Sequence, residues 1–443
     1  MAVTLLQRFA SGAPAPMFVL AVGRGRRLER RLHLEDGLRV VDSPRHASIL
    51  VVTSPLPEPV RSAARLVHDQ MPHPRAVVTL AATDEIFPRA DHADRGDLTE
   101  TVREVYEALC RGERPSTQPL MPEQNPVEWR GVGPHGQGGE GMMGGKPYGR
   151  RMAMVGEEIR DGLMLTRLTV TLGPFLPWLP PGLELAVDLQ GDVIQSRVPE
   201  GLPSDRPAIF ERAQAEPVAV ADLEVARARH HLEATADLML VHGLEALARH
   251  TLGVAQRVEP GEAGPVDWLS HRLERSLALR PATRSVGQIK GEDAERLGPV
   301  SRAAGHGHDA RLDDPSYEGL DVEPVVGERG DTEARVRQRL RETEQAIDIA
   351  GRAGDRMREP GPTLEGPRGP SDDQIGQRWR HLLVDRAPGM AFDEFVTTLV
   401  SLDLDPSRMP SSEDYGDSRV GNYADDDQSG GGHGDHHGHQ HHG

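Results

Sequence analysis

A single cysteine limits the redox chemistry of this chain. Cys110 is the one cysteine among 443 residues. An iron–sulfur cluster is held by about four thiolates, or by fewer thiolates together with histidines. One thiol therefore cannot anchor a cluster within this chain, and it cannot form an internal disulfide, which fits a reducing cytoplasm. We expect Cys110 to be an ordinary helix cysteine, and we expect no redox cofactor to be bound by this chain alone.

Histidines crowd the end of the chain. They are His433, His436, His437, His439, His441 and His442, with acidic residues at 425–427 and 435. Imidazole binds Ni²⁺, Zn²⁺ or Cu²⁺, so the tail is a candidate site for a divalent metal. Residues 409–443 have no apolar periodicity and much Gly and Asp, which predicts a disordered, acidic, His-rich tail. Adventitious metal binding by a solvated tail is the alternative.

A third set of polar residues is spaced as residues on a helix are. His230, His231, Glu233 and Asp237 fall within a stretch that is rich in Ala and Leu. A carboxylate–histidine pair could relay protons. An ion pair at the surface or at an interface is the alternative that we favour. His306 and His308 lack a third fixed ligand nearby in the sequence, which favours a role in loop packing over a metal site.

Composition restricts the partners that we expect. The chain is 37% hydrophobic and 4% aromatic, contains 48 Gly and 36 Pro, and has a formal net charge of −18. About half of it is expected to pack into a core. The acidity argues against nucleic acid and against a polybasic membrane anchor. No stretch approaches the ~18 apolar residues of a membrane span, so we expect membrane contact to come through partner subunits.

The first part of the chain, residues 1–115, has an α/β pattern. Short apolar runs at 17–22, 47–53 and 76–81 predict buried strands. A helix is expected at 60–71, between the second and third strands, which makes a right-handed βαβ unit. A further helix is expected at 99–109, with Thr99 or the weaker candidate Thr101 as its N-cap.

The remainder divides into a linker, a second domain and the tail. Residues 116–145 are rich in Gly and Pro and predict a linker. Residues 146–408 predict an α+β, helix-rich domain. Its expected elements are two paired strands at 163–170 and 183–194, one long helix at 218–255, a helix at 332–350 that Asp331 caps, and a short helix at 392–402.

Residues 43–81, SPRHASILVVTSPLPEPVRSAARLVHDQMPHPRAVVTLA, resemble the small, cluster-bearing subunit of respiratory complex I and of energy-converting hydrogenases. In that family such a segment leads directly into a cysteine, whereas Ala82 and Thr83 stand here. The family's cysteines near the first strand are also missing, because this chain has GRGRR at 23–27. The resemblance implies a flavodoxin-like α/β fold without its cluster.

The second domain resembles the large, quinone-site subunit of the same complexes. The matching segments are GPHG at 133–136, GKPYG at 145–149, GLELAVDLQGDVIQ at 182–195, GPVSRAAGHGHDARLDDPSY at 298–317, EGPRG at 365–369 and TLVSLDL at 398–404. The nickel-binding cysteines of the hydrogenases are absent. His135 is the candidate for the histidine of the family's quinone pocket.

Both resemblances imply one function. We expect a subunit of a complex I-like or hydrogenase-like membrane complex that lacks its own redox centre. It would lie on the cytoplasmic face and dock on antiporter-like and other ion-translocating membrane subunits. Two alternatives stay open. One is a peripheral arm of an NADH- or ferredoxin-linked quinone oxidoreductase, with a quinone pocket between the two domains. The other is a nickel- or zinc-handling protein that works through the tail.

Overall fold

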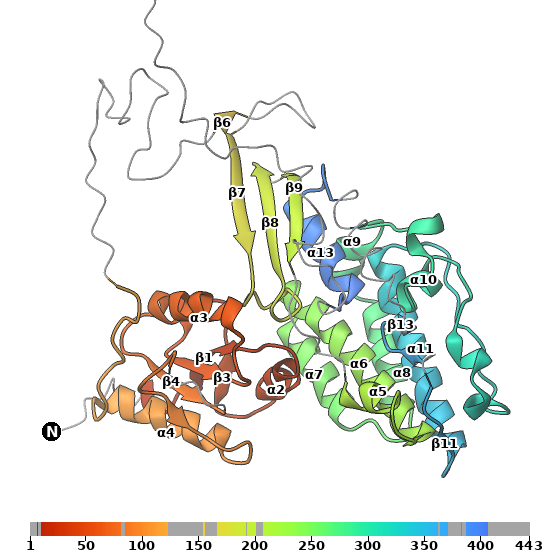
Figure 1. Cartoon of the computed structure of the whole chain (residues 1–443), viewed down its shortest axis with the longest axis horizontal. Helices are drawn as coiled ribbons and strands as arrows, with labels where there is room; N and C mark the ends of the chain where they lie inside the picture. The colour runs from red at the N-terminus through yellow and green to blue at the C-terminus, as the bar shows by residue number, and fades with distance from the viewer. Residues whose placement is uncertain are drawn as a thin grey trace, which may run out of the picture.

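A computed structural model of the chain describes residues 7, 10–80, 85–122, 154–155, 166–191, 193–200, 207–361, 364–370, 382 and 387–405. They form an α/β domain, up to residue 122, and an α+β domain, from residue 154 onward, that lie side by side (Figure 1). No helix within these residues is both long and apolar enough to cross a membrane.

A parallel sheet forms the centre of the first domain. Its strands are β1 (Ala15–Leu20), β2 (Leu38–Val40), β3 (Ile49–Val52), β4 (Ala76–Thr79) and β5 (Asp91–His92). Their order is β2-β1-β3-β4-β5 and every neighbouring pair is parallel. This is the doubly wound order of flavodoxin-type sheets. The expected α/β pattern is thus confirmed, although β2 and β5 were not predicted.

Helices cover both faces of this sheet. Helix α3 (Glu58–Gln70) packs on the face that carries Phe18 and Leu20. Helices α2 (Gly25–Leu32) and α4 (Leu98–Arg111) pack on the face that carries Met17 and Val19. Alternate residues of β1 therefore serve the two layers, as the two-residue period of a strand requires. The expected caps of α4 are wrong, because the helix begins at Leu98, before Thr99.

The second domain opens with an antiparallel sheet. Its strands are β6 (Met154–Val155), β7 (Thr166–Leu172), β8 (Glu184–Gln190) and β9 (Val193–Glu200), in that order. The predicted strand pair is confirmed as β7 and β8. The prediction of one strand over 183–194 is wrong, because β8 ends at Gln190 and the chain turns into β9. Gly191 has φ +67° at this turn, a conformation that glycine adopts without strain.

Helices form the rest of this domain. They are α5 (Ala208–Arg212), α6 (Val220–Val241), α7 (Glu245–Gln256), α8 (Gly264–Glu274), α9 (Leu279–Thr283), α10 (Pro299–Ala303), α11 (Thr332–Ala353) and α13 (Phe392–Leu402). Two short ladders accompany them, β10 (Val218–Ala219) with β11 (Met357–Arg358), and β12 (Glu365–Gly366) with β13 (Gly369–Pro370).

Two of the predicted helices are confirmed and one is corrected. Helices α11 and α13 lie where the sequence predicts them, and the Asp331 side chain accepts a hydrogen bond of 2.8 Å from the Ala334 amide. The single long helix over 218–255 is wrong. It is divided into α6 and α7 at Gly243, which has φ +69°. Helices α6 and α11 pack against each other at the centre of the domain (Figure 1).

Candidate functional site: a charged interior along helix α6

The sequence-predicted metal and quinone residues cannot be placed. The six tail histidines and His135 lie outside the described residues. Cys110 lies near the end of α4 and is partly buried. Burial and a hydrogen bond with Cys110 raise the pKa of Tyr106 to about 12. Within the described residues, no three His, Cys, Asp or Glu side chains are grouped as a metal would require.

The polar residues of α6 are brought together and are buried. Glu224, Arg227 and His231 are each fully buried, and their spacing places them on one side of the helix. His230 and Glu233 are also buried. The favoured ion pair is found at an interface, because Glu233 and Asp237 pair with Arg30 of the first domain. A surface position is wrong for the histidines, which are buried, and the proton relay stays a prediction.

Arg302 on α10 is the centre of the first group of charges. Its guanidinium donates to both carboxylate oxygens of Glu342 on α11, from Nε at 2.7 Å and from Nη2 at 2.9 Å. Its Nη1 donates to Glu365 at 2.9 Å and to the His308 carbonyl at 3.1 Å. Two carboxylates, on α11 and β12, therefore converge on one buried cation.

A second arginine extends the group toward the start of α6. Arg311 donates to Asp309 from Nη2 at 2.7 Å and to Glu224 from Nη1 at 2.9 Å. The Tyr317 hydroxyl also donates to Glu224, at 2.7 Å. Burial, and then the negative charge of Glu224, raise the pKa of Tyr317 well above its ordinary value. Arg227 reaches Glu224 at 3.2 Å and also donates to the carbonyls of residues 365 and 366.

The carboxylates of this group outnumber its arginines. The arginines are Arg227, Arg302 and Arg311, and the carboxylates are Glu224, Asp309, Glu342 and Glu365. Burial alone would raise the pKa of Glu342, but Arg302 holds it well below its ordinary value. With all of these groups ionised and His231 neutral, the group has one negative charge in excess.

His231 is buried beside this excess negative charge. Its Nε2 lies 3.4 Å from Glu342 Oε2, and neither ring nitrogen has a hydrogen-bond partner among the described residues. Burial lowers the pKa of His231 to about 4, although Glu342 acts in the opposite direction. The ring is therefore neutral at pH 7. A buried imidazole next to a carboxylate is a group that could take up a proton if either moved.

A neighbouring group of charges joins α6 to the turn between β12 and β13 and to the end of α13. His230 Nε2 lies 2.6 Å from Asp403 Oδ2, and Arg368 donates to Asp403 Oδ1 at 2.9 Å. Asp403, just after α13, has φ +54°. In this left-handed conformation the backbone of residues other than glycine is strained. Burial would raise the pKa of Asp403, but Arg368 and His230 hold it far below its ordinary value.

Arg335 on α11 has no carboxylate ion pair among the described residues. Arg335 donates to the carbonyls of Gly287 and Gly330 and to the hydroxyls of Ser401 and Thr332. Burial and then the nearby Arg339 lower the pKa of Arg335 to about 9. Helix α11 therefore contributes both a cation, Arg335, and an anion, Glu342, to the buried interior.

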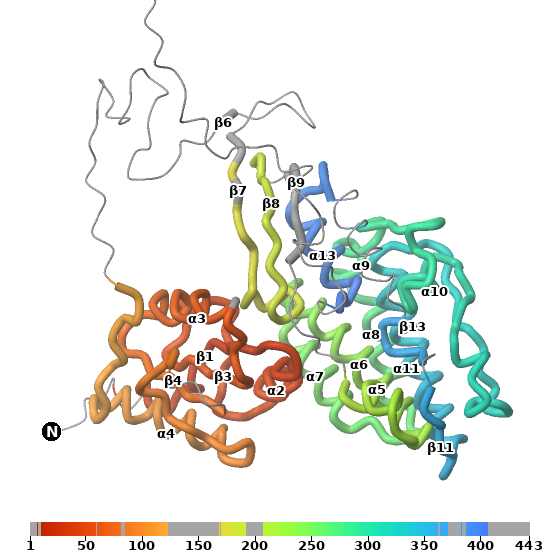
Figure 2. The backbone as a smooth tube through the Cα atoms, viewed as in Figure 1, coloured from red at the N-terminus to blue at the C-terminus, as the bar shows by residue number. Residues whose placement is uncertain are grey.

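The other end of α6 faces the first domain. Arg30 on α2 donates to Glu233 at 2.8 Å and to Asp237 at 2.6 Å. Arg26 donates to the Pro177 carbonyl at 2.6 Å and pairs with Glu29 at 2.8 Å. Figure 2 shows α2 as the part of the first domain that lies beside the second. These contacts, which we call the interdomain tie, join the two domains through buried charges.

The tie lies at the switch point of the parallel sheet. Helix α2 follows the carboxyl end of β1, next to β3, which is where doubly wound folds bind ligands. Here Arg26 and Glu29 meet Phe175 and Pro177 of the second domain around a cavity of about 10 Å³. That is about the space of one water molecule. This cavity is therefore too small for a quinone ring.

Stability alone does not account for such an interior. Removing charges from water costs several kcal/mol per ion, and well-packed apolar residues often stabilise a core equally well. Clusters of perturbed ionisable groups instead mark candidate functional sites. The arrangement can hold net charge in the interior, and it connects that charge through one helix to the position of the first domain.

The site was partly visible in the sequence. The segments at 298–317, 365–369 and 398–404, singled out for their resemblance to the large subunit, supply Arg302, Arg311, Glu365, Arg368 and Asp403. The structure brings these three segments together around α6 and α11. Sequence reasoning missed Glu342 and Arg335, because charged residues on a helix are ordinarily solvent-exposed.

The family that matches this chain covers part of the second domain. Residues 267–382 match the family described as "Respiratory-chain NADH dehydrogenase, 49 Kd subunit". No curated protein sequence matches the chain. Among solved structures, the chain is similar to a chain of the membrane-bound sulfane sulfur reductase, an archaeal respiratory membrane complex. The identity is 16% and the TM-score 0.38, over 55% of this chain and 98% of that chain. The family match confirms, over residues 267–382, the resemblance of the second domain to the large subunit of respiratory-chain NADH dehydrogenase.

Proposed function

We propose that this chain is a subunit of a complex I-like or energy-converting-hydrogenase-like membrane complex. It docks on antiporter-like, ion-translocating membrane subunits at the cytoplasmic face and has no redox centre of its own. The observation that carries the proposal is the family match of residues 267–382. This segment supplies Arg302, Arg311, Glu342 and Glu365 to the charged interior.

Two observations support the absence of a redox centre. The chain contains one cysteine, too few for a cluster. The stretch at 23–27, where the small-subunit resemblance would place cysteines, instead leads into α2 with Arg26 and Arg30. Those arginines pair with Glu233 and Asp237 of the second domain. In this proposal, an electrostatic tie occupies the place of the cluster.

The mechanism that we propose is structural. Helix α6 carries the tie at Glu233 and Asp237 and the charged interior at His230, His231 and Arg227. A displacement of the first domain would move the partners of Glu233 and Asp237, and would thereby move the same helix within the interior. The charge state of the interior would then depend on the docking state of the subunit, which is a way to gate an associated ion pathway.

The test is affinity purification of the native full-length chain from membranes in mild detergent. Partners are identified by mass spectrometry and iron is measured in the eluate. The proposal predicts membrane subunits in stoichiometric amount and no iron that stays with this chain when it is separated from them. Recovery of the chain alone from the soluble fraction would contradict it.

The same purification addresses the alternatives. Iron that copurifies on other chains, together with quinone reduction by the eluate, would favour the peripheral arm of a quinone oxidoreductase. Metal handling by the tail stays a prediction and is tested separately below.

A further inference from the structure

The outer face of α8 carries exposed aromatic and basic side chains. Trp268 is 51% exposed, and Arg272 and Arg275 are exposed as well. At 100° per residue, positions 268, 272 and 275 fall within one narrow stripe of the helix. Leu269 and Leu273 lie on the opposite side, in the core. Leu277, in the turn after α8, is 92% exposed. We call Trp268, Arg272, Arg275 and Leu277 the α8 patch.

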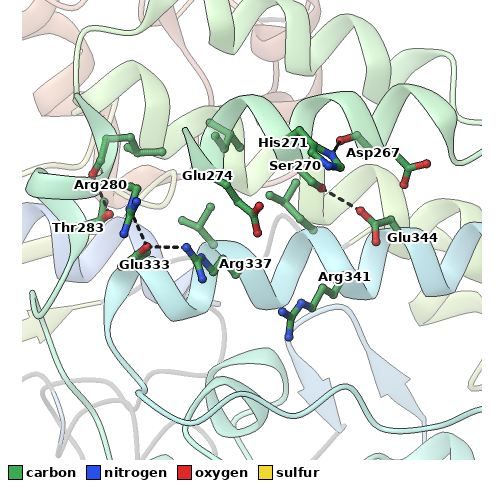
Figure 3. A pocket seen from close by; sticks show the side chains of 14 residues that line it. Asp267, Ser270, His271, Glu274, Arg280, Thr283, Glu333, Arg337, Arg341 and Glu344 are labelled. Atoms are coloured by element: carbon green, nitrogen blue, oxygen red, sulfur yellow. Dashed lines mark hydrogen bonds and ion pairs between the residues drawn. The ribbon is translucent and has the colours of Figure 1, made fainter. Parts of the chain in front are cut away.

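The acidic residues of α8 point elsewhere. Asp267 and Glu274 line a cleft of about 220 Å³ between α8, α9 and α11, where Ser270 donates to Glu344 at 2.9 Å (Figure 3). The α8 patch is therefore separated from the carboxylates of its own helix. This cleft contains arginines and carboxylates in similar number, so it gives no preference for the charge of a ligand.

The cations of the patch are available. In the described part of the chain, neither Arg272 nor Arg275 has an ion-pair or hydrogen-bond partner through its side chain. The same holds for Arg284 and Lys290, which follow in the sequence. Residues 268–290 contain four arginines, one lysine and one glutamate, a net charge of +4, in a chain whose net charge is −18. This segment is therefore more basic than the chain as a whole.

We propose that the α8 patch binds the surface of an anionic lipid bilayer. Arginines near a membrane are attracted to anionic headgroups, and Trp is enriched where hydrocarbon meets water. His250 of α7 lies against the Trp268 ring, with centroids 4.6 Å apart, and supports that ring at the surface. Leu277, between Arg275 and Arg280 in sequence, is the tip that enters the headgroup layer.

The composition of the patch favours lipid over an acidic protein partner. A stable protein interface buries about 800 Å² on each side around an apolar centre. The patch offers two apolar side chains that are flanked by arginines. Mobile headgroups can adapt to such a surface, whereas a rigid partner would leave it poorly packed. The proposal goes beyond the proposed function, because it names the face that lies toward the bilayer and can fail independently.

The experiment is sedimentation of the full-length chain with vesicles of phosphatidylcholine alone or with about one-third phosphatidylglycerol. We expect binding to the anionic vesicles only. Arg272→Glu with Arg275→Glu should lower the vesicle-bound fraction by about tenfold or more. Leu277→Ser should lower it severalfold. Arg31→Glu with Arg103→Glu makes the same charge change at exposed positions of the first domain and should leave binding unchanged.

Three outcomes would overturn the proposal. One is that the wild-type protein does not bind anionic vesicles, even though it copurifies with membrane subunits. Another is an equal loss of binding in the first-domain control. The third is an α8 double variant that still binds vesicles but loses its copurifying membrane subunits, which would assign the patch to an acidic protein. A chemical unfolding curve for each variant verifies that its fold is intact.

Discussion

Both domains have apolar cores, but the interiors differ in how much charge they enclose. In the first, β3 and its neighbours bury Leu50, Val51 and Val77 against apolar helix residues. In the second, α6 and α11 enclose Glu224 and Arg302 together with their partners. Apolar burial stabilises a core whatever the geometry of its neighbours. A buried ion network stabilises one arrangement of its groups and destabilises any other. The interior of the second domain is therefore suited to a subunit whose function depends on the position of its elements.

Loss of a central cation should have the largest effect. Arg302→Met leaves Glu342 and Glu365 buried without their partner, and we expect a loss of about 3–5 kcal/mol in the free energy of unfolding, measured by urea denaturation. The control is Arg352→Met, which removes an exposed ion pair with Asp321 and should cost under about 1 kcal/mol. Similar losses for both variants would mean that the interior is not a coupled network.

A cavity in the apolar interior should cost somewhat less and behave differently with pH. Leu50→Ala in β3 removes a fully buried side chain, and we expect a loss of about 3 kcal/mol. Because no ionisable group is removed, the loss should be the same at pH 5 and pH 8. A loss that changed between pH 5 and pH 8 would refute the contrast between the domains.

Acid should weaken the charged interior through His231. Its pKa is lowered to about 4 in the folded protein, from 6.5. Between these values the unfolded chain binds more protons, so stability falls as pH decreases from 6.5 toward 4, by up to about 3 kcal/mol. His231→Gln should remove that part of the pH dependence, measured by unfolding curves at each pH. The exposed control His46→Gln should retain the decrease in the free energy of unfolding between pH 6.5 and pH 4. If His231→Gln showed the same decrease as the wild type, His231 would not be its cause.

The tail histidines should show the smallest effect on stability. Removal of residues 430–443 eliminates His433 through His442, and we expect the free energy of unfolding to change by less than about 0.5 kcal/mol. Tight Ni²⁺ or Zn²⁺ binding, measured by titration calorimetry, should disappear. Binding that survives the truncation would place a metal site elsewhere in the chain.

Apolar patterns made the first domain largely predictable. Strands β1, β3 and β4 were located because continuous apolar runs bounded by Pro and Gly predict buried parallel strands. Helix α2 was missed because 25–32 has Leu28 and Leu32 as its apolar positions and arginine or glutamate at most others. Its buried side is formed largely by Arg26, Glu29 and Arg30. Arg26 pairs with Glu29, and both arginines also have partners in the second domain.

The charged interior was less predictable, for a physical reason. Arg302 and Glu342 are 40 residues apart, and only the packing of α10 on α11 pairs them. Local patterns assign such residues to solvent. The spacing of Glu224, Arg227 and His231 was a usable signal, since it places a carboxylate, a guanidinium and an imidazole on one side of a helix. The break at Gly243 was missed because Ala and Leu continue the helical pattern on both sides.

The most direct test of the account is a double-mutant cycle across the interdomain tie. It compares Arg30→Met, Asp237→Asn and the double variant by urea unfolding, with Arg31→Met as the exposed neighbour of Arg30. The account predicts a coupling of about 2 kcal/mol between Arg30 and Asp237. It also predicts easier proteolytic separation of the domains in both single variants. Additivity within about 0.5 kcal/mol, with both domains still joined, would contradict the claim that buried charges make the two domains one unit.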